Sequence, residues 1–114
     1  MSNWVPEDDK LAVLAKGARS RVQAQSGAAL RDETGRTYAS ADVSVGSLKL
    51  SAVAMVVAQA VASGSTGVES VVVSPNGEFK ISDSDLELVR AFAGAGIPLH
   101  VVDESGSPID TRLT

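Results

Sequence analysis

The order of apolar and polar residues divides the chain into segments typical of helices and strands. Residues 48–64, LKLSAVAMVVAQAVASG, are almost entirely apolar, and their four polar residues fall within about half of a helical wheel. This pattern predicts a central helix that other elements or other subunits cover. The segment is shorter than the ~20 apolar residues that span a bilayer, so we expect it inside a small soluble domain.

The N-terminal part of the chain predicts a first helix. Pro6 precedes three acidic residues, which favour a helix N-terminus, and apolar residues then recur at spacings of three and four as far as Val22. We expect about four helical turns that end before Gly27. Trp4 lies just before this helix, and the sequence leaves open whether it packs on its own domain or in a partner subunit.

A β-hairpin is expected next. Two runs of alternating apolar and polar residues flank the turn sequence DETG at residues 32–35, in which Gly35 supplies the positive φ of a tight turn. The first strand is expected to reach Glu33, and the second to run over residues 36–43.

The C-terminal half predicts a strand, a helix and a strand. The valine-rich run 68–75 and the run 97–104 are typical of buried strands. Between them, Ser82-x-x-Asp85 has the spacing of a capping box and predicts a helix that ends at Gly94 or Gly96. This order gives two parallel strands joined by a right-handed crossover.

Together these segments predict an α/β fold in the order α-β-β-α-β-α-β. The hairpin and the parallel unit make a mixed sheet of four strands with helices on its faces, an α/β/α sandwich. All 114 residues are expected to form one domain, with residues from about 105 to 114 as a flexible polar tail.

Composition excludes several classes of site. The chain has no cysteine and one histidine, which excludes disulfides, thiolate metal ligands and a site of several histidines within one chain. The net charge of −4 and the aromatic content of 4% argue against nucleic-acid binding. The N-terminus has no signal-peptide pattern, so we expect a cytoplasmic location and no association with membranes.

Four segments in order resemble the homotetrameric, zinc-dependent cytidine deaminases over nearly the whole chain. The segments are GAAL at 27–30 with the turn and Tyr38 after it, the apolar helix 48–64, residues 81–92, and IPLHVVDESG at 97–106. The resemblance implies the cytidine deaminase-like fold and a homo-oligomer, either a dimer or a tetramer.

The resemblance also implies that the zinc chemistry is absent. In that family a Cys or His of the central helix and two Cys of the next helix hold the zinc, which activates water, and a Glu transfers protons. The three ligand positions correspond to Ser51, Ser82 and Asp85, and the proton-transfer position to Val53. Serine hydroxyls bind zinc poorly and valine exchanges no proton. We therefore expect no zinc and no catalytic residue at these degenerate positions.

Other readings of the same residues remain open. Ser82 and Asp85 are explained by helix capping, or they form with Ser51 an oxygen-ligand site for Mg²⁺ or Ca²⁺. His100 is either a packed or interface residue or a base for Ser51.

Asp42 and Ser44 stand where the family has the Asn and Glu that hold the ribose, so they are candidates for substrate binding or are only strand-end residues. The sequence thus predicts a non-catalytic cytidine deaminase-like protein that acts as an oligomeric scaffold or interaction module, with an unidentified protein partner. The alternative is a divergent cytidine deaminase, another hydrolase or a nucleoside-binding protein that uses the ancestral cleft with different residues.

Overall fold

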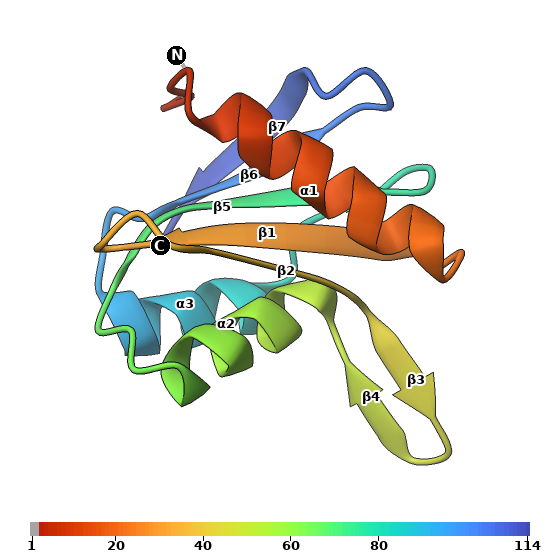
Figure 1. Ribbon diagram of the computed structural model, residues 1–114, viewed down its shortest axis with the longest axis horizontal. Helices are drawn as coiled ribbons and strands as arrows, with labels where there is room; N and C mark the ends of the chain where they lie inside the picture. The colour runs from red at the N-terminus through yellow and green to blue at the C-terminus, as the bar shows by residue number, and fades with distance from the viewer. Residues whose placement is uncertain (1–2) are drawn as a thin grey trace.

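A five-stranded sheet between two layers of helix forms the body of the protein (Figure 1). The structure, a computed structural model, describes residues 3–114. Its elements are α1 (Asp8–Arg21), β1 (Ser26–Asp32), β2 (Thr37–Ala41), β3 (Val43–Val45), β4 (Leu48–Leu50), α2 (Ala52–Ala62), β5 (Val68–Pro75), α3 (Asp83–Ala93), β6 (Pro98–Val102) and β7 (Pro108–Leu113).

The strand order in the sheet is β2-β1-β5-β6-β7, and β3 pairs with β4 in a separate two-stranded ribbon. Strand β1 is antiparallel to both β2 and β5, whereas β5 and β6 are parallel and are joined through α3. Strand β7 is antiparallel to β6. The mixed α/β fold, with an N-terminal hairpin and a parallel β-α-β unit, is therefore confirmed.

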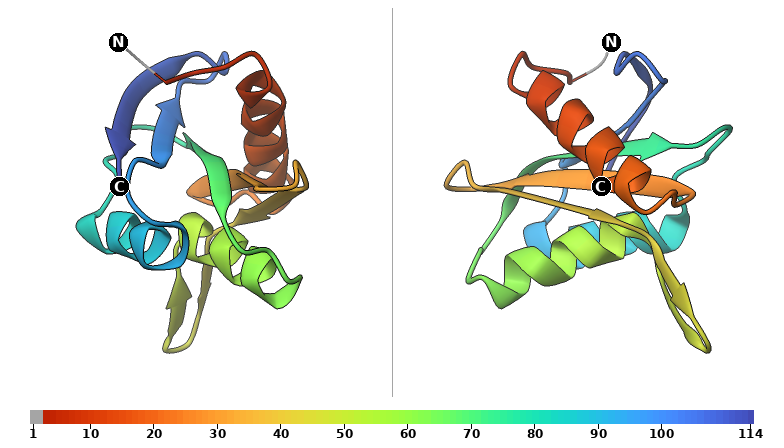
Figure 2. Two further views of the ribbon diagram at one scale, coloured as in Figure 1. Left: turned by 90° about the vertical axis from the view of Figure 1, so that its left-hand side faces the viewer. Right: turned by 45° about the vertical axis from the view of Figure 1, so that its right-hand side comes forward.

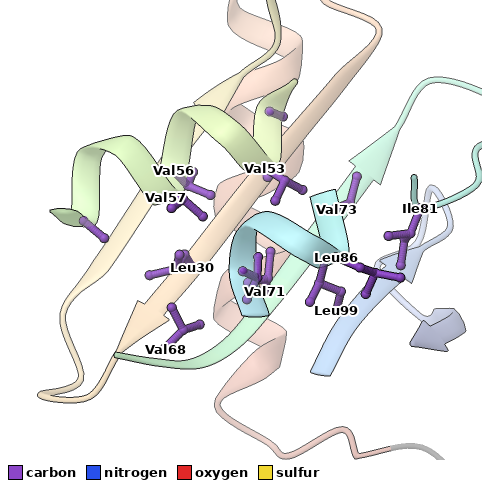
Figure 3. Close-up of a cluster of buried hydrophobic side chains, with 14 of the residues drawn as sticks. Leu30, Val53, Val56, Val57, Val68, Val71, Val73, Ile81, Leu86 and Leu99 are labelled. Carbon is purple, nitrogen blue, oxygen red and sulfur yellow. The ribbon is translucent and has the colours of Figure 1, made fainter. Parts of the chain in front are cut away.

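Alternation along β5 divides the apolar core between the two faces of the sheet. Val71 and Val73 contact the layer of α2 and α3, whereas Val72 contacts α1, because successive strand residues point to opposite faces. The larger cluster lies between the sheet and α2 and α3 (Figure 3). This arrangement explains why residues 68–75 are apolar without a polar alternation: both faces of the strand are covered.

The central helix begins later than the apolar run predicts. Residues Leu48–Leu50 form β4, and α2 starts at Ala52 because Ser51 is its N-cap and accepts a hydrogen bond from the Ala54 backbone. Gly46, with φ of 57°, makes the turn between β3 and β4. Apolar residues fit both a helix and this ribbon, so the cap and the turn decide the boundary.

The C-terminal segment was expected to be a flexible tail, and this prediction is wrong. Asp103 accepts hydrogen bonds from the backbones of Ser105 and Ser107 and closes a tight turn after β6. The chain then returns as β7 and pairs with β6 from Leu113 to Pro108. The sheet therefore has five strands instead of four. Among residues 3–114 no helix is long and apolar enough to cross a bilayer.

Buried Asp32 fixes the turn between β1 and β2. Its carboxylate accepts hydrogen bonds from the Ser65 hydroxyl, from the Thr34 backbone and hydroxyl, and from the Arg36 backbone. Burial alone would raise the pKa of Asp32, but these hydrogen bonds outweigh it and hold the pKa well below its usual range. One carboxylate thus joins the hairpin to the loop before β5.

Helix α1 packs so closely on β1 that only glycine fits at position 27. A Cβ on Gly27 would lie 2.1 Å from the Ala15 carbonyl oxygen and 3.0 Å from the Arg19 backbone nitrogen. Both contacts are with backbone atoms, so the neighbours cannot turn aside as a flexible side chain could. The glycine of GAAL therefore sets the distance between α1 and the sheet.

We predict that Gly27→Ala destabilises the fold by about 2 kcal/mol or more, because α1 must move away from β1. The matched control is Gly17→Ala inside α1, where a Cβ would meet only the end of the Arg21 side chain at 3.7 Å. That variant should gain about 0.5–1 kcal/mol from helix propensity. Urea denaturation of both variants measures these differences, and equal effects would show that the close approach is not a constraint.

Candidate functional site

The N-termini of α2 and α3 meet beside a small cavity of about 220 Å³. The cavity is lined by residues of β1 and β5, of the starts of both helices and of the segment before α3. Its lining is Ser26, Ser51, Ala52, Val53, Val73, Phe79, Lys80, Ser82 and Asp85. All four positions singled out in the sequence as degenerate (Ser51, Val53, Ser82 and Asp85) are therefore brought together here.

Hydrogen bonds link the two helix starts directly. The Ser51 hydroxyl donates to Asp85 Oδ1 at 2.7 Å, and its oxygen accepts from the Ala54 backbone at 3.0 Å. The Ser82 hydroxyl oxygen accepts from the Asp85 backbone at 3.1 Å. Both serines are thus N-caps, so capping explains Ser82. The Asp85 carboxylate instead accepts from Ser51 of the other helix start.

The charge of Asp85 suits this position. Its side chain is buried, with 6% of the residue exposed, and it lies in the first turn of α3 while accepting a hydrogen bond from the N-cap of α2. Helix N-termini carry partial positive charge, so one carboxylate stabilises both ends. The positively charged residue Lys80 also lines the cavity.

Val53 belongs to the apolar core. It is 1% exposed and packs with Val56 and Val73 between α2 and the sheet (Figure 3). A side chain in this position presents only methyl groups to the cavity, so it can neither hold a proton nor bind a metal ion.

The sequence profile of the family described as cytidine deaminase-like matches residues 4–106. The chain belongs to the cytidine deaminase-like family. A comparison with curated proteins gives no match.

Solved cytidine deaminases share the fold of this family member. The enzyme from Burkholderia pseudomallei superposes with a TM-score of 0.76 at 19% identity, over 92% of this chain and 89% of that one. The enzyme from Mycobacterium leprae gives a TM-score of 0.74 at 18% identity, over 99% of this chain and 94% of that one. At these identities the likeness shows the fold alone, and it confirms the resemblance found in the sequence.

The family resemblance implies a zinc ion beside this cavity, but the residues present do not fit one. The donors are one carboxylate and two hydroxyls, and both hydroxyl oxygens already accept backbone hydrogen bonds. Structural and catalytic zinc sites use Cys, His and carboxylate ligands. Within the described part of the chain, no three His, Cys, Asp or Glu side chains form a group that could hold a metal ion.

Asp42 and Ser44 do not line the cavity. Asp42 Oδ1 accepts a hydrogen bond from the Ser26 backbone at 2.9 Å and closes the open end of the β1–β2 hairpin. Ser44 lies on the exposed ribbon, where its hydroxyl oxygen accepts from Lys49 Nζ at 2.9 Å. Instead, Ser26, Phe79 and Lys80 reach the cavity, and no sequence pattern singles these three out.

His100 and Ser51 lie on opposite faces of the sheet, so the structure does not form the Ser–His pair. His100 is fully buried under α1, with its ring centroid 5.0 Å from that of Trp4 in a T-shaped contact. Its Nδ1 lies 2.8 Å from Thr111 Oγ1, and its Nε2 lies 3.6 Å from Asp8 Oδ2. Because Nε2 faces a carboxylate, we assign the proton of the neutral ring to Nε2.

Further charges surround this histidine. The buried Asp8 carboxylate also pairs with Arg31 Nη1 at 3.0 Å, and Arg31 in turn donates to Glu69 at 2.7 Å. These charged groups anchor the start of α1 to the sheet. Trp4 packs on its own domain, because it contacts His100 and the apolar cluster under α1. Burial lowers the pKa of His100 from its ordinary value of 6.5, although the charge of Asp8 opposes the shift.

We predict that acid destabilises the fold through His100. Its pKa is lower in the folded than in the unfolded chain, so its contribution is complete above about pH 6.5 and is lost as the pH falls below that value. Urea denaturation of the wild type and of His100→Gln between pH 7.5 and 5 measures this term. The wild type should lose more stability, by up to about 1.4 kcal/mol per pH unit for one proton. Identical pH dependence in both proteins would contradict the assignment.

Proposed function

We propose that this protein is a non-catalytic member of its family that acts as an oligomeric scaffold or interaction module. One observation carries the proposal: Ser51, Ser82 and Asp85 bond to one another and to helix backbones, at the positions where the family resemblance implies metal ligands. Deamination of this type needs an activated water and a group that transfers protons. Ser51, Ser82 and Asp85 do not fit a zinc ion that would activate water, and Val53 stands at the proton-transfer position.

The outer surface of α2 supports an oligomeric role. This helix is apolar on nearly every side, and its exposed residues include Ala58, Val61 and Ala62. In water-soluble proteins a helix that is apolar all round is normally buried. We therefore propose that a second copy covers this face in a homodimer or homotetramer.

The β3–β4 ribbon offers a second apolar surface. It projects from the body of the protein (Figure 2). Val43 lies opposite Leu50 and Val45 opposite Leu48, so the four apolar side chains share one face. Val45, Leu48 and Leu50 are exposed. A lone two-stranded hairpin is only marginally stable in water, so the proposed role includes a subunit or an unidentified protein partner that covers the ribbon.

A second candidate function is nucleoside binding or a divergent hydrolase activity in the ancestral cleft. The persistence of a cavity between Ser51, Lys80 and Asp85 favours it. However, the volume of about 220 Å³ is below the ~300–1,000 Å³ of ordinary ligand pockets, which favours the scaffold. A cytoplasmic location stays a prediction from the N-terminal sequence.

We predict that the protein, purified with zinc in every buffer, deaminates neither cytidine nor deoxycytidine. The ultraviolet absorbance change on deamination measures the rate, and the Burkholderia pseudomallei enzyme serves as the positive control. Turnover above the protein-free blank would refute the non-catalytic assignment.

A nucleoside panel separates the two candidate functions. The scaffold role predicts no change in melting temperature with millimolar nucleosides, because a ligand that binds only the folded state would raise it. A rise of several degrees with any nucleoside would favour the second candidate.

A further inference from the structure

Strand β2 leaves one edge of the sheet open. It pairs only with β1 among the described residues, in an unbroken register from Arg31–Thr37 to Gly27–Ala41. At one end of β2 the Asp32 backbone N–H donates to the Arg36 carbonyl, and at the other end the Asp42 backbone N–H donates to the Ser26 carbonyl. The even-numbered residues from 36 to 42 therefore direct their backbone groups toward β1. Because successive backbone groups point to opposite edges, three residues direct their N–H and C=O groups away from β1: Thr37, Ala39 and Ala41.

The two edge strands of the sheet differ in the features that prevent pairing with another chain. Edge strand β7 begins with Pro108, has an irregular register near Val102, and carries the charges of Asp110 and Arg112. Proline, bulges and charged side chains are the usual means of preventing unwanted strand pairing. Strand β2, TYASA, has no proline, no charge and no register shift. Of its outward backbone groups, the Ala41 carbonyl accepts a hydrogen bond from the Ser40 hydroxyl at 3.0 Å and keeps a second lone pair. The outward groups are thus available to another strand.

We infer that two copies of this chain pair through their β2 strands, antiparallel about a two-fold axis at Ala39. This inference rests on the proposed homo-oligomer and names its interface. In this register Ala39 faces its own equivalent and Thr37 faces Ala41 of the second copy. These are the residues whose backbone groups point outward, so each of the three pairings forms two backbone hydrogen bonds. The two sheets become one continuous sheet.

Charge complementarity favours a second copy of this chain as the partner of the β2 edge. The same register places Arg36 opposite Asp42 of the second copy, and by symmetry Asp42 opposite the other Arg36. These are non-hydrogen-bonded positions, at which side chains across a strand pair come closest. Both residues flank β2 and have internal partners: Arg36 Nε donates to Asp32 Oδ2 at 3.2 Å, and Asp42 Oδ1 accepts from the Ser26 backbone at 2.9 Å. Arg36 has half of its side chain exposed and Asp42 is partly exposed, so the other guanidinium nitrogens and the second carboxylate oxygen can pair across the interface. A shift by two residues in either direction loses both this charge pairing and one pairing of outward backbone groups.

The neighbouring helix extends this interface. Helix α2 packs against β2, and α3 lies along another side of α2 (Figure 2). Exposed Ala58 and Ala62 are spaced by four residues on the surface of α2 that neither the sheet nor α3 covers. Small side chains allow two helices to approach closely, so the α2 helices of two copies can meet beside the paired strands.

Cysteine cross-linking tests the inference directly, because the chain contains no cysteine. In the Ala39→Cys variant the two thiols face each other, and the ~5.5 Å between paired Cα atoms lies within the range of disulfides. The matched control is Ala95→Cys, in the exposed turn between α3 and β6. Under mild oxidation, the Cys variant at 39 should form a disulfide-linked dimer at least about ten-fold faster than the control, since pairing raises the effective thiol concentration.

Light scattering of the wild type separates the possible failures. An oligomer whose variant at position 39 links no faster than the control overturns the β2 interface and leaves the proposed oligomer standing. A wild-type monomer with equally slow linking of both variants overturns both. Fast linking at position 39 alone, in a protein that keeps its circular dichroism spectrum, supports pairing through β2.

Discussion

The hydrogen bond between Ser51 and Asp85 joins the first turns of α2 and α3, and the form of the site depends on it. Two helix N-termini that converge bring together partial positive charges and backbone N–H groups without partners. Something negative must lie between them. The family resemblance implies a metal with anionic ligands there, whereas this chain places one buried carboxylate and two capping hydroxyls at the same positions. The junction is therefore closed by the chain itself.

The closed junction between α2 and α3 changes which surfaces of the molecule can interact with ligands or other proteins. With Val53 in the core and the serines engaged as caps, the cavity keeps little reactive surface. Within residues 3–114, the features that no other element covers lie elsewhere: the outer face of α2, the β3–β4 ribbon and the open edge of β2. Another chain can cover each of these three surfaces, and catalysis does not require such surfaces. The proposed scaffold role and the proposed β2 pairing both follow from that distribution.

The elements that could be predicted from the sequence are those whose own pattern of apolar residues or helix caps is strong, although β5 pairs with strands far away in the chain. The sequence pattern placed β5, α3 and the parallel pair correctly, and the family resemblance identified Ser51, Ser82 and Asp85 as neighbours. The prediction failed where the residues of a segment fit two structures or none: Leu48–Leu50 fits a helix or a strand, and only pairing with β3 and the Ser51 cap make it a strand. Likewise, the polar C-terminal segment is ordered as a strand by pairing with β6, and buried Asp8 lies beside His100 only because α1 crosses the sheet.

A double-mutant cycle on Ser51 and Asp85 tests the central claim most directly. The free energy of unfolding is measured for the wild type, Ser51→Ala, Asp85→Ala and the double variant, in chelator-treated buffer and again with added zinc. We predict a favourable coupling of about 1–3 kcal/mol, as for hydrogen bonds to a charged group, with the same value in both buffers. A coupling below about 0.5 kcal/mol, within ordinary additivity, would contradict the account, as would a stabilisation by zinc that Asp85→Ala abolishes.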